Sequence, residues 1–516
     1  MGISRRDFLM RVGQAGGYSA AFTTMQSLGL LPIKESMAEP IAATKGVGKG
    51  VRLVVLGGGV AGLTTAYEAR KLGYDVTLLE ARHRPGGRAW SARNGDVVEF
   101  VDGTRQNITW SDGLYQNMGP ARLPSVHGTI LGYCRELKVP LEVEINTSRS
   151  SLLQNDKVNG GKPYVQRKVI NDTRGQVSEL LAKAIAGGSL DQDLSKEDRD
   201  RMVESLKFYG GLDKTGKYTG CDRANIVRYP GAGPQTMVVD QDPIPIHVLL
   251  DANFWSSELY EEAWDWQATM MQPVGGMQQI SNAFAKALGS AVIYEAPVTE
   301  IAKTAKGVRV TYDKAGAEHS IDADYAVCAM PLTILRKIKA DLDADHRSAV
   351  DGAKYQSSFK IPWESKRFWE TDYNIYGGLS FLSQGPSPVW YPSSSLMSER
   401  GIVVAGYMDE FSGGFDKLTM QEKFDASRAQ IEKLHPGHGK DLEKPIFCGW
   451  RHIKWNEGSW IGAISQQDYD TITTPDGPIY FAGDHTSHVV GWQEGAALSG
   501  RRAVQMISDK VKSAQA

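Results

Sequence analysis

Four residues near the N-terminus have the types and spacing needed to hold a dinucleotide. Gly57, Gly59 and Gly62 form a G-x-G-x-x-G pattern, and Glu80 follows at about the spacing of a ribose-binding acid. The first glycine allows a tight turn, the second lets the backbone approach a pyrophosphate, and the third lets a helix pack closely on a strand. A carboxylate at Glu80 can accept hydrogen bonds from ribose hydroxyls. These residue types indicate a dinucleotide site.

The segment 51–80 also carries the elements that must position these residues. Residues 53–56 are a short apolar run, typical of a strand buried on both faces. Small and apolar residues recur at helical spacing over 61–72, and Gly73 is placed to end that helix. Residues 76–79 predict the next buried strand. The pattern predicts a parallel strand–helix–strand unit whose helix N-terminus faces the phosphates. Such a unit without a ligand is the alternative.

A cationic, glycine-rich loop follows Glu80 almost at once. Arg84, Gly87 and Arg88 belong to the motif R-x-G-G-R, and its arginines can lie along a diphosphate. This motif after such an acid resembles the FAD-binding signature of the flavin amine oxidase family, which nicotinamide dehydrogenases do not normally carry. The resemblance implies that the cofactor is FAD.

A second strand-to-helix turn lies near the C-terminus. Residues 479–484 predict a strand that ends in Ala482-Gly483-Asp484, and Gly491-Trp492-Gln493 opens a helix. The N–H groups at such a helix start suit the flavin pyrimidine ring, which becomes anionic on reduction. The motif resembles A-G-[ED] of the same family, whose acid bonds the ribityl chain and whose aromatic after the next glycine walls the substrate site. These roles correspond to Asp484 and Trp492. Aspartate stands where glutamate is commoner, which leaves the detailed ribityl contact open.

The segment from Asn117 to Pro124, followed by His127, resembles the G-P-x-R-L-P…H segment of the L-amino-acid oxidases within this family. The resemblance implies that Arg122 binds the substrate carboxylate, a task that suits the fork of a guanidinium. A structural arginine paired to an acid is the alternative. His127 is a possible base, although a packing or gating role is the reading we favour.

Three further positions follow from the resemblance. Lys360 matches the lysine that holds a water against flavin N5, with a surface lysine on an alternating strand as the alternative. Tyr391, just before Pro392, matches the tyrosine that donates a second hydrogen bond to the substrate carboxylate, with core packing as the alternative. Val298 matches a valine whose backbone contacts adenine.

The predicted site residues fall into three groups. The residues expected along the cofactor are Gly57, Gly59, Gly62, Glu80, Ala81, Arg82, Gly87, Arg88, Gly119, Pro120, Ala121, Arg122, Val298, Gly483, Asp484, Gly491, Trp492 and Gln493. The residues expected at the substrate are Arg122, Tyr391, Gly491 and Trp492, and Lys360 is the expected catalytic residue. Trp450, Trp455 and Trp460 either wall the pocket or merely pack.

Length and composition indicate an ordinary globular protein with more than one domain. The chain has 516 residues, of which 41% are hydrophobic and 23% charged. We expect an α/β fold: a Rossmann-like FAD-binding domain of the glutathione reductase and amine oxidase type, a mixed-sheet substrate domain and a helical insertion. The expected boundaries are 45–125, 270–345 and 465–510 for the FAD-binding domain, 126–165, 248–269 and 346–464 for the substrate domain, and 166–247 for the helical domain.

Two patterns support the helical insertion. Val177, Leu180, Leu181, Ala184 and Ile185 fall on one helical face. Ser195 with Asp198 resembles a capping box, and the helix that it starts is expected to run to about residue 209.

Charge and cysteine content narrow the class of protein. A net charge of −2 gives no overall field that favours nucleic acid or an anionic membrane. Four scattered cysteines form no C-x-x-C pair, and Cys448 is not in the context of covalent-flavin members, so the FAD is expected to be non-covalent. His485 and His488 lack the acid or cysteine that would complete a metal set, and no metal is expected.

The N-terminus resembles an export signal. Ser4-Arg5-Arg6-Asp7-Phe8-Leu9 resembles a twin-arginine motif, and Ser36-Met37-Ala38 offers a small-x-small cleavage site. We expect residues 1–44 to be an export leader and linker, which would place the protein in the periplasm or outside the cell. A basic leader on a cytoplasmic protein is the alternative. The apolar stretch 12–31 is interrupted by polar residues and glycine and is not read as a membrane span.

The resemblance implies a reaction class: oxidation of a C–N bond with hydride transfer to FAD N5, hydrolysis of the imine, and reoxidation by molecular oxygen to hydrogen peroxide. For an L-amino acid the products are a 2-oxo acid and ammonia. A monoamine or polyamine oxidase, which would lack the carboxylate clamp, and an L-amino-acid 2-monooxygenase are the alternatives within this fold. A catalytically silent flavoprotein is a further alternative, against which Lys360 and Arg122 argue. A homodimer is expected from the resemblance alone.

Overall fold

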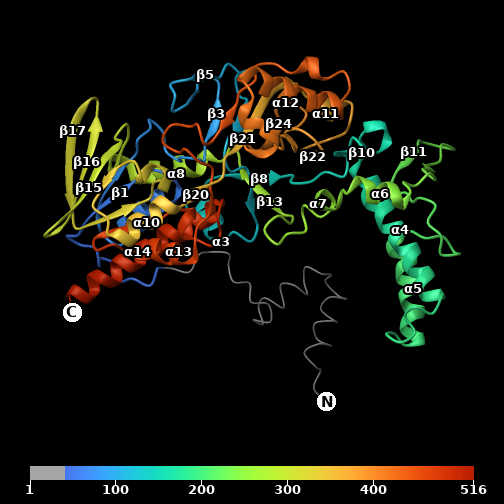
Figure 1. The fold of residues 1–516 in the computed structure, drawn as a ribbon, viewed down its shortest axis with the longest axis horizontal. Coiled ribbons are helices and arrows are strands. Elements are labelled where there is room, and N and C mark those ends of the chain that lie inside the picture. The colour runs from blue at the N-terminus through green and yellow to red at the C-terminus, as the bar shows by residue number, and fades with distance from the viewer. Residues whose placement is uncertain (1–40, 516) are drawn as a thin grey trace.

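The computed structural model describes residues 41–515, and Figure 1 shows an elongated molecule with a helical arm at one end. Residues 1–40 of the predicted leader, which include its twin-arginine motif and cleavage site, lie outside the described residues. Within them, no helix combines the length and the apolarity that a membrane crossing requires.

A five-stranded parallel sheet forms the base of one half. Its order is β14-β2-β1-β18-β27, with β1 (Arg52–Leu56) in the centre. The other strands are β2 (Asp75–Leu79), β14 (Val292–Ile293), β18 (Tyr325–Cys328) and β27 (Ile479–Phe481). The sheet therefore collects strands from three separate parts of the chain. The strand–helix–strand unit predicted over 51–80 is confirmed, with α2 (Val60–Lys71) as its helix.

Both faces of β1 are covered, because alternate side chains of a strand point to opposite sides. Leu53 and Val55 pack in an apolar cluster with residues of α2, α8 (Gln278–Leu288) and α14 (Gln493–Gln515). Val54 and Leu56 pack in another cluster, with residues of β15 (Val298–Thr304), β16 (Gly307–Lys314) and α10 (Ala344–Gly352). Burial on both faces is what the apolar run 53–56 predicts.

The strands β15 and β16 belong to a four-stranded sheet at the end opposite the helical arm (Figure 1). Its order is β17-β16-β15-β19, with β17 (Ala317–Ala323) and β19 (Lys339–Ala340) at the edges. Two short helices, α9 (Leu332–Leu335) and α13 (Gln466–Ile472), contribute to the same apolar cluster.

A seven-stranded sheet of order β10-β9-β22-β23-β24-β21-β25 forms the other half. Its strands are β9 (Leu152–Gln154), β10 (Tyr164–Val165), β21 (Ser358–Lys366), β22 (Gly378–Leu382), β23 (Val389–Tyr391), β24 (Arg400–Asp409) and β25 (Cys448–Gly449). The pair β22–β9 is parallel and the other pairs are antiparallel, so the predicted mixed sheet is confirmed. Its apolar cluster includes residues of α11 (Phe368–Thr371) and α12 (Met420–Leu434).

Short elements connect the two halves. A three-stranded sheet of order β7-β13-β8 pairs β7 (Leu123–Pro124), β13 (Met270–Pro273) and β8 (Leu141–Glu144). The remaining short elements are β3 (Ser91–Arg93), β4 (Val97–Glu99), β5 (Arg105–Asn107), β6 (Tyr115–Asn117), α3 (Gly128–Glu136), β20 (Lys354–Tyr355), β26 (Ile461–Ala463), and the 3-10 turns η1 (Asn159–Gly161), η2 (Gly289–Ala291), η3 (Ser412–Lys417), η4 (Gly439–Asp441) and η5 (Asp484–Thr486).

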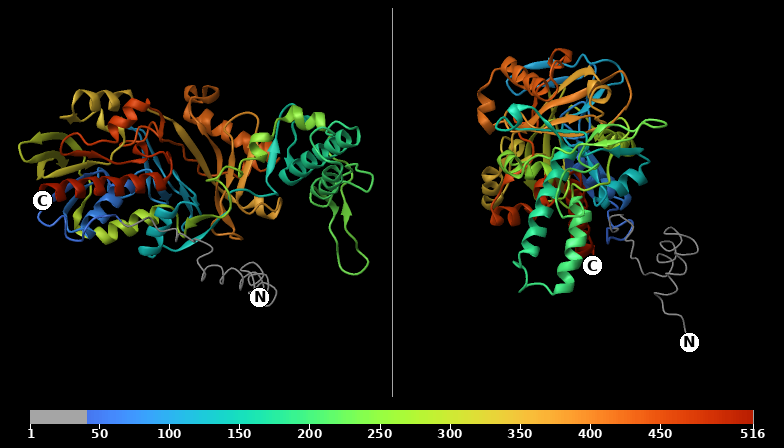
Figure 2. Two further views of the ribbon diagram at one scale, coloured as in Figure 1. Left: turned by 90° about the horizontal axis from the view of Figure 1, so that it is seen from below. Right: turned by 90° about the vertical axis from the view of Figure 1, so that its right-hand side faces the viewer.

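The helical arm projects from the body, as Figure 2 shows from two sides. It contains α4 (Gln166–Ala186), α5 (Lys196–Gly210), α6 (Ile246–Ala252), α7 (Trp255–Glu258) and a hairpin of β11 (Ile226–Arg228) and β12 (Val238–Val239). The predicted helix start is confirmed, because the Ser195 side chain accepts a hydrogen bond from the backbone N–H of Asp198. The predicted domain boundaries stay predictions.

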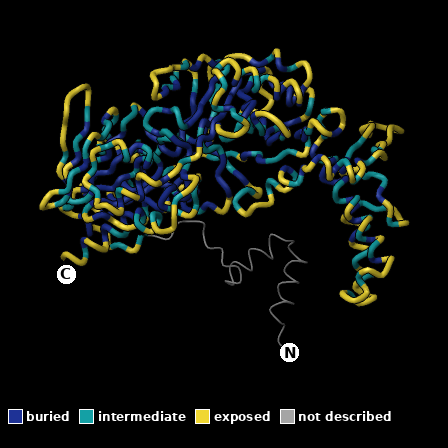
Figure 3. The backbone as a smooth tube through the Cα atoms, viewed as in Figure 1, coloured by how far each residue is buried: buried dark blue, intermediate teal, exposed yellow. Residues whose placement is uncertain are grey.

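The predicted apolar face of α4 is only partly buried. Val177 and Leu180 are about half exposed, whereas Gly175, Ser178 and Ile185 are buried. Figure 3 shows that buried, intermediate and exposed segments alternate along the helical arm. The reason is close helix packing: a Cβ at Gly210 of α5 would meet the Ser178 Cβ at 2.4 Å. The small side chain of Ser178 on α4 therefore faces α5, and a pattern of large apolar residues does not predict such a contact.

Candidate active site

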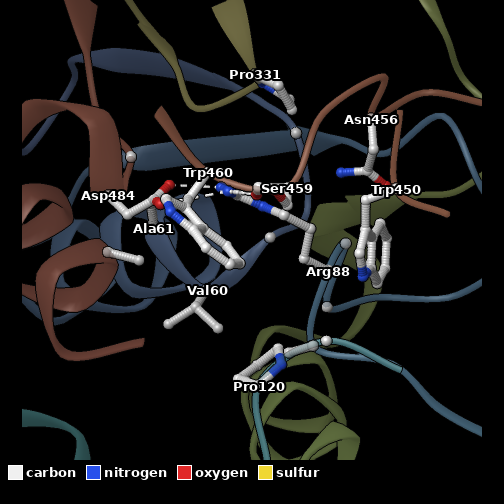
Figure 4. Close-up of a pocket in the computed structure, with 18 of the residues that line it drawn as sticks. Val60, Ala61, Arg88, Pro120, Pro331, Trp450, Asn456, Ser459, Trp460 and Asp484 are labelled. Carbon is white, nitrogen blue, oxygen red and sulfur yellow. Dashed lines mark hydrogen bonds and ion pairs between the residues drawn. The ribbon is translucent and has the colours of Figure 1, made fainter. Parts of the chain in front are cut away.

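A cavity of about 430 Å³ lies between the parallel sheet and the seven-stranded sheet. Figure 4 shows part of its lining, to which segments from both ends of the chain contribute. All residues predicted along the cofactor line it except Gly62. Of the residues predicted at the substrate, Arg122, Gly491 and Trp492 line it and Tyr391 does not.

The three glycines of the first turn have different surroundings. Gly57 has a φ of +109°, a conformation that other residues rarely adopt. A Cβ at Gly62 would meet the carbonyl oxygen of Gly57 at 2.0 Å, so this glycine allows the helix to approach the turn. A Cβ at Gly59 would meet no atom within 4 Å, although Gly59 lines the cavity. The turn is thus open where a pyrophosphate would approach the backbone.

We expect Gly59→Ala and Gly62→Ala to separate ligand binding from folding. Gly59→Ala should leave the thermal midpoint of the apoprotein nearly unchanged but weaken flavin binding about tenfold or more, because its methyl group enters the cavity. Gly62→Ala should destabilise the apoprotein by about 2 kcal/mol or more through overpacking. Thermal melts with and without added FAD measure both effects. Equal destabilisation by the two variants would contradict this assignment.

The Glu80 carboxylate is held at the end of β2. Its Oε2 accepts a hydrogen bond from the Gly58 backbone N–H at 2.7 Å, and its Oε1 accepts one from the Arg82 N–H at 2.8 Å. The carboxylate is buried, and it lines the cavity beside Ala81 and Arg82. A carboxylate fixed in this way fits the ribose-binding role predicted from its spacing.

Arg88 and Asp484 form an ion pair in the wall of the cavity (Figure 4), in which Asp484 is buried and Arg88 is about a quarter exposed. Arg88 Nη2 lies 2.5 Å from Asp484 Oδ1, and Nη1 lies 3.2 Å from Oδ2. Burial alone would raise the pKa of Asp484, but the Arg88 guanidinium holds that pKa below its usual value. Asp484 also accepts a hydrogen bond from the Gly491 N–H at 3.2 Å. The pair therefore joins the two motifs that are predicted to bind the cofactor, which lie at opposite ends of the sequence.

Arg122 lines the cavity, and one edge of its guanidinium has no hydrogen-bond acceptor among the described residues. Its Nη1 donates hydrogen bonds to Asn146 Oδ1 at 2.6 Å and to the Tyr260 hydroxyl at 2.7 Å. Its central carbon lies 4.2 Å from the Trp266 ring centre and 4.4 Å from that of Trp390, so the guanidinium packs against two indole rings. Within residues 41–515, no group accepts from Nε or Nη2 and no carboxylate forms an ion pair with Arg122. This edge suits a planar carboxylate that accepts two parallel hydrogen bonds.

Lys360 on β21 is buried and lines the same cavity. Its Nζ donates to the carbonyl oxygens of Asn117 at 2.8 Å and of Gly119 at 2.6 Å. Burial and the neighbouring Arg122 cation lower the pKa of Lys360 to about 7. This position excludes the alternative of a surface lysine.

Tryptophans form much of the remaining wall. Trp492 meets Trp266 edge to face, with ring centres 5.7 Å apart, and meets His127 in the same way at 4.9 Å. Trp450, Trp455 and Trp460, which the sequence left unassigned, also line the cavity. His127 does not line it, and burial lowers the pKa of His127 to about 4. A neutral imidazole packed on Trp492 fits the packing role favoured from sequence.

The substrate role predicted for Tyr391 does not fit its position and is corrected here. The Tyr391 hydroxyl donates to Ser380 Oγ at 2.9 Å and lies 2.6 Å from His435 Nε2, in the core behind the sheet. Successive side chains of β23 point to opposite faces, so Trp390 lines the cavity instead. The alternation of side chains along this strand could have shown from the sequence that Trp390 and Tyr391 do not both face the cavity.

Sequence reasoning also missed Asn146, Tyr260, Trp266 and Tyr407, which surround Arg122 or Lys360. Tyr407 lies opposite Lys360 in the register of β21 and β24, with its ring centre 5.6 Å from Lys360 Nζ. Tyr260 and Trp266 come from the irregular segment after the helical arm, where no periodicity identifies an inward face.

A profile of flavin-containing amine oxidoreductases matches residues 60–508. The chain belongs to this family. L-Amino-acid oxidases are among its relatives: that of Echis ocellatus is 27% identical over 475 residues, covering 88% of this chain and 88% of that protein. That of Pseudechis australis is 26% identical, covering 89% of this chain and 86% of that protein.

A solved structure of wild-type putrescine oxidase bound to putrescine shares the fold of this amine oxidoreductase, with a TM-score of 0.58 at 19% identity. The match covers 89% of this chain and 98% of that chain. At this identity the likeness shows the fold alone.

The family implies a flavin cofactor, and the cavity residues fit one. The open face of Gly59 suits a pyrophosphate, and the buried Glu80 carboxylate suits a ribose. Two buried polar atoms of cavity-lining residues, Gln493 Oε1 and His485 Nε2, have no hydrogen-bond partner among the described residues. Such atoms are rare in a completed protein interior and indicate space for a polar ligand.

Proposed function

We propose that this protein is an FAD-dependent L-amino-acid oxidase that converts L-amino acids to 2-oxo acids, ammonia and hydrogen peroxide. The observation that carries the proposal is the Nε–Nη2 edge of Arg122. Arg122 lines the cavity, its Nε and Nη2 have no acceptor among residues 41–515, and its Nη1 is fixed by Asn146 and Tyr260. Fixing a cation in this way before the ligand arrives lowers the ordering cost of carboxylate binding.

The cofactor is proposed to be non-covalent FAD, which when bound supplies the acceptor for the substrate hydride. No cysteine among the described residues lines the cavity, which supports non-covalent binding. The chain's own contribution is positioning: Arg122 holds the carboxylate, while Trp390 and Trp492 wall the substrate and exclude water.

Lys360 is proposed to hold a water molecule at the reacting centre. Two of its hydrogen-bonding directions point to the carbonyls of Asn117 and Gly119. An ammonium has three donors, so one remains for a water in the cavity. With a pKa of about 7, the amine of Lys360 is also able to exchange a proton with that water near neutral pH.

An amine oxidase is the second candidate, because putrescine oxidase shares the fold. An L-amino-acid 2-monooxygenase is the third, and its reaction would release an amide instead of an oxo acid. The decisive experiment is peroxide release by the flavin-loaded protein with L-amino acids, their D-isomers and simple amines. We expect peroxide from L-amino acids only. Turnover of amines that lack a carboxylate would contradict the proposal, and amide without matching peroxide would indicate a monooxygenase.

We also propose that the protein is exported by the twin-arginine route and forms a homodimer. Exposed apolar side chains of the helical arm, such as Phe208 and Tyr229, support an interface there. Replacing Arg5 and Arg6 by lysine should keep the protein in the cytoplasm, which cell fractionation measures. Light scattering measures the mass in solution.

A further inference from the structure

A second, smaller cavity of about 30 Å³ lies next to the first. Ala121 and Trp390 line both cavities and separate them. The small cavity is large enough for about one water molecule. Two polar side chains that line it, Glu144 and Tyr115, each have an oxygen without a hydrogen-bond partner among residues 41–515.

Glu144 is the unusual member of this pair, because it is an acid buried without a direct partner for its charge. It lies at the end of β8, is 4% exposed, and forms no ion pair with any described residue. Burial raises the pKa of Glu144 to about 7, while the Arg122 cation, a hydrogen bond from the Trp390 side chain and the Lys360 cation lower it. Its charge in turn stabilises the Arg122 cation, together with Tyr260. Each of these two charges therefore favours the ionised form of the other, although they form no ion pair.

The other charged and titratable groups around Glu144 are few. Arg122 and Lys360, which line the main cavity, interact electrostatically with Glu144, as does Tyr260, and Tyr115 and Tyr391 line the small cavity together with it. Glu142 on the same strand is bonded to Gln272 Nε2 at 2.9 Å instead. Arg122 and Lys360 are the two cations that interact with Glu144. An anion bound to Arg122 would therefore raise the pKa of Glu144.

A substrate carboxylate on the free edge of Arg122 brings a second negative charge to a cation that already balances Glu144. Two carboxylates close together in a poorly hydrated site disfavour each other's ionised form. Protonation of Glu144 removes the repulsion between the two carboxylates. A water molecule in the small cavity would bring the proton to Glu144.

We propose that Glu144 is the counter-ion of Arg122 in the substrate-free protein and takes up a proton from solvent when a substrate carboxylate binds to Arg122. The inference rests on the proposed carboxylate site. Its consequence is that carboxylate binding weakens as pH rises through the neutral range, because an ionised Glu144 must then be protonated.

Titration calorimetry of the flavin-loaded protein with benzoate tests this directly. The titration is run at about pH 8 in phosphate and in Tris, two buffers that differ in ionisation enthalpy. The difference between the two binding heats gives the number of protons taken up per benzoate bound. We expect uptake of about 0.7 proton, and therefore a Kd that rises about fivefold over one pH unit around pH 8. Uptake near zero in the wild-type protein would overturn the proposal without any variant.

Three variants identify the residue that takes up the proton. Glu144→Gln should remove most of the uptake and most of the pH dependence of the Kd. Glu142→Gln is the matched control on the same strand and should leave both unchanged. Lys360→Met should retain the uptake, because Lys360 is the other group near the site with a pKa of about 7. Uptake that persists in Glu144→Gln but is lost in Lys360→Met would overturn the proposal.

Arg122→Ala separates this inference from the proposed function. Benzoate binding that is lost in Arg122→Ala supports the carboxylate site. If binding depends on Arg122 but takes up no proton, only the role of Glu144 is wrong. If benzoate fails to bind, or binds Arg122→Ala as tightly as the wild type, the proposed carboxylate site fails and the role of Glu144 fails with it.

Discussion

Replacing Arg122 by alanine is expected to lower kcat/KM for L-amino acids about 10³-fold. Two hydrogen bonds between a guanidinium and a carboxylate contribute together about 4 kcal/mol, at about 1.5–3 kcal/mol each. Because the carboxylate is not the reacting group, the loss should appear mainly in KM, with a smaller loss in kcat from poorer orientation. Steady-state peroxide release against substrate concentration separates the two parameters.

Arg122→Lys is the control that keeps the charge and removes the planar fork. It should recover only a small part of the lost kcat/KM, since an ammonium cannot bind a carboxylate through two parallel hydrogen bonds. Full recovery by lysine would mean that charge alone matters and that the geometry of Asn146 and Tyr260 around Arg122 is incidental. An unchanged KM in Arg122→Ala would remove the support for an amino-acid substrate.

Breaking the ion pair between Arg88 and Asp484 is expected to have the largest effect on stability. Arg88→Met leaves the buried Asp484 carboxylate without its cation, which costs about 3–5 kcal/mol. The apoprotein should melt at a clearly lower temperature and retain less flavin after gel filtration, because the pair joins the two cofactor-binding motifs. Differential scanning calorimetry and flavin absorbance measure these changes.

The double variant Arg88→Met/Asp484→Leu should recover part of the lost thermal stability, since no unpaired charge remains buried. Arg309 and Asp322 on β16 and β17 provide a matched control. That pair is also bidentate, at 2.7 and 2.8 Å, but both side chains are about half exposed. Arg309→Met should leave the melting temperature nearly unchanged, because water screens an exposed pair. Equal losses of melting temperature in Arg88→Met and Arg309→Met would contradict the expectation that burial makes the Arg88–Asp484 pair more important for stability.

The nucleotide-binding half of the site could be predicted from sequence because its determinants are local. A glycine turn, the helix after it and the acid at the next strand end lie within 30 residues of one another, and their geometry follows from backbone conformation. The same holds for the second turn around Asp484. It also holds for the helix that begins after Ser195, because its N-cap hydrogen bond joins two residues only three positions apart. Short-range hydrogen bonds and steric limits are properties of the segment itself, so the segment's residues are enough to predict them.

Contacts between distant segments were decided only by the tertiary structure. Arg122 is fixed by Asn146 and Tyr260 and packs against Trp266 and Trp390, and these four residues come from three separate stretches of the chain. Tyr391 was assigned to the substrate from its neighbour Pro392, but the face that β23 turns to the cavity belongs to Trp390. The isolation of Glu144 likewise depends on which side chains close around it. A one-residue shift reverses the face of a strand, and burial removes the water that would otherwise solvate a charge. The sequence by itself therefore determined the family and the cofactor-binding motifs, whereas packing between distant strands decided which side chains face the substrate and which charges must balance one another.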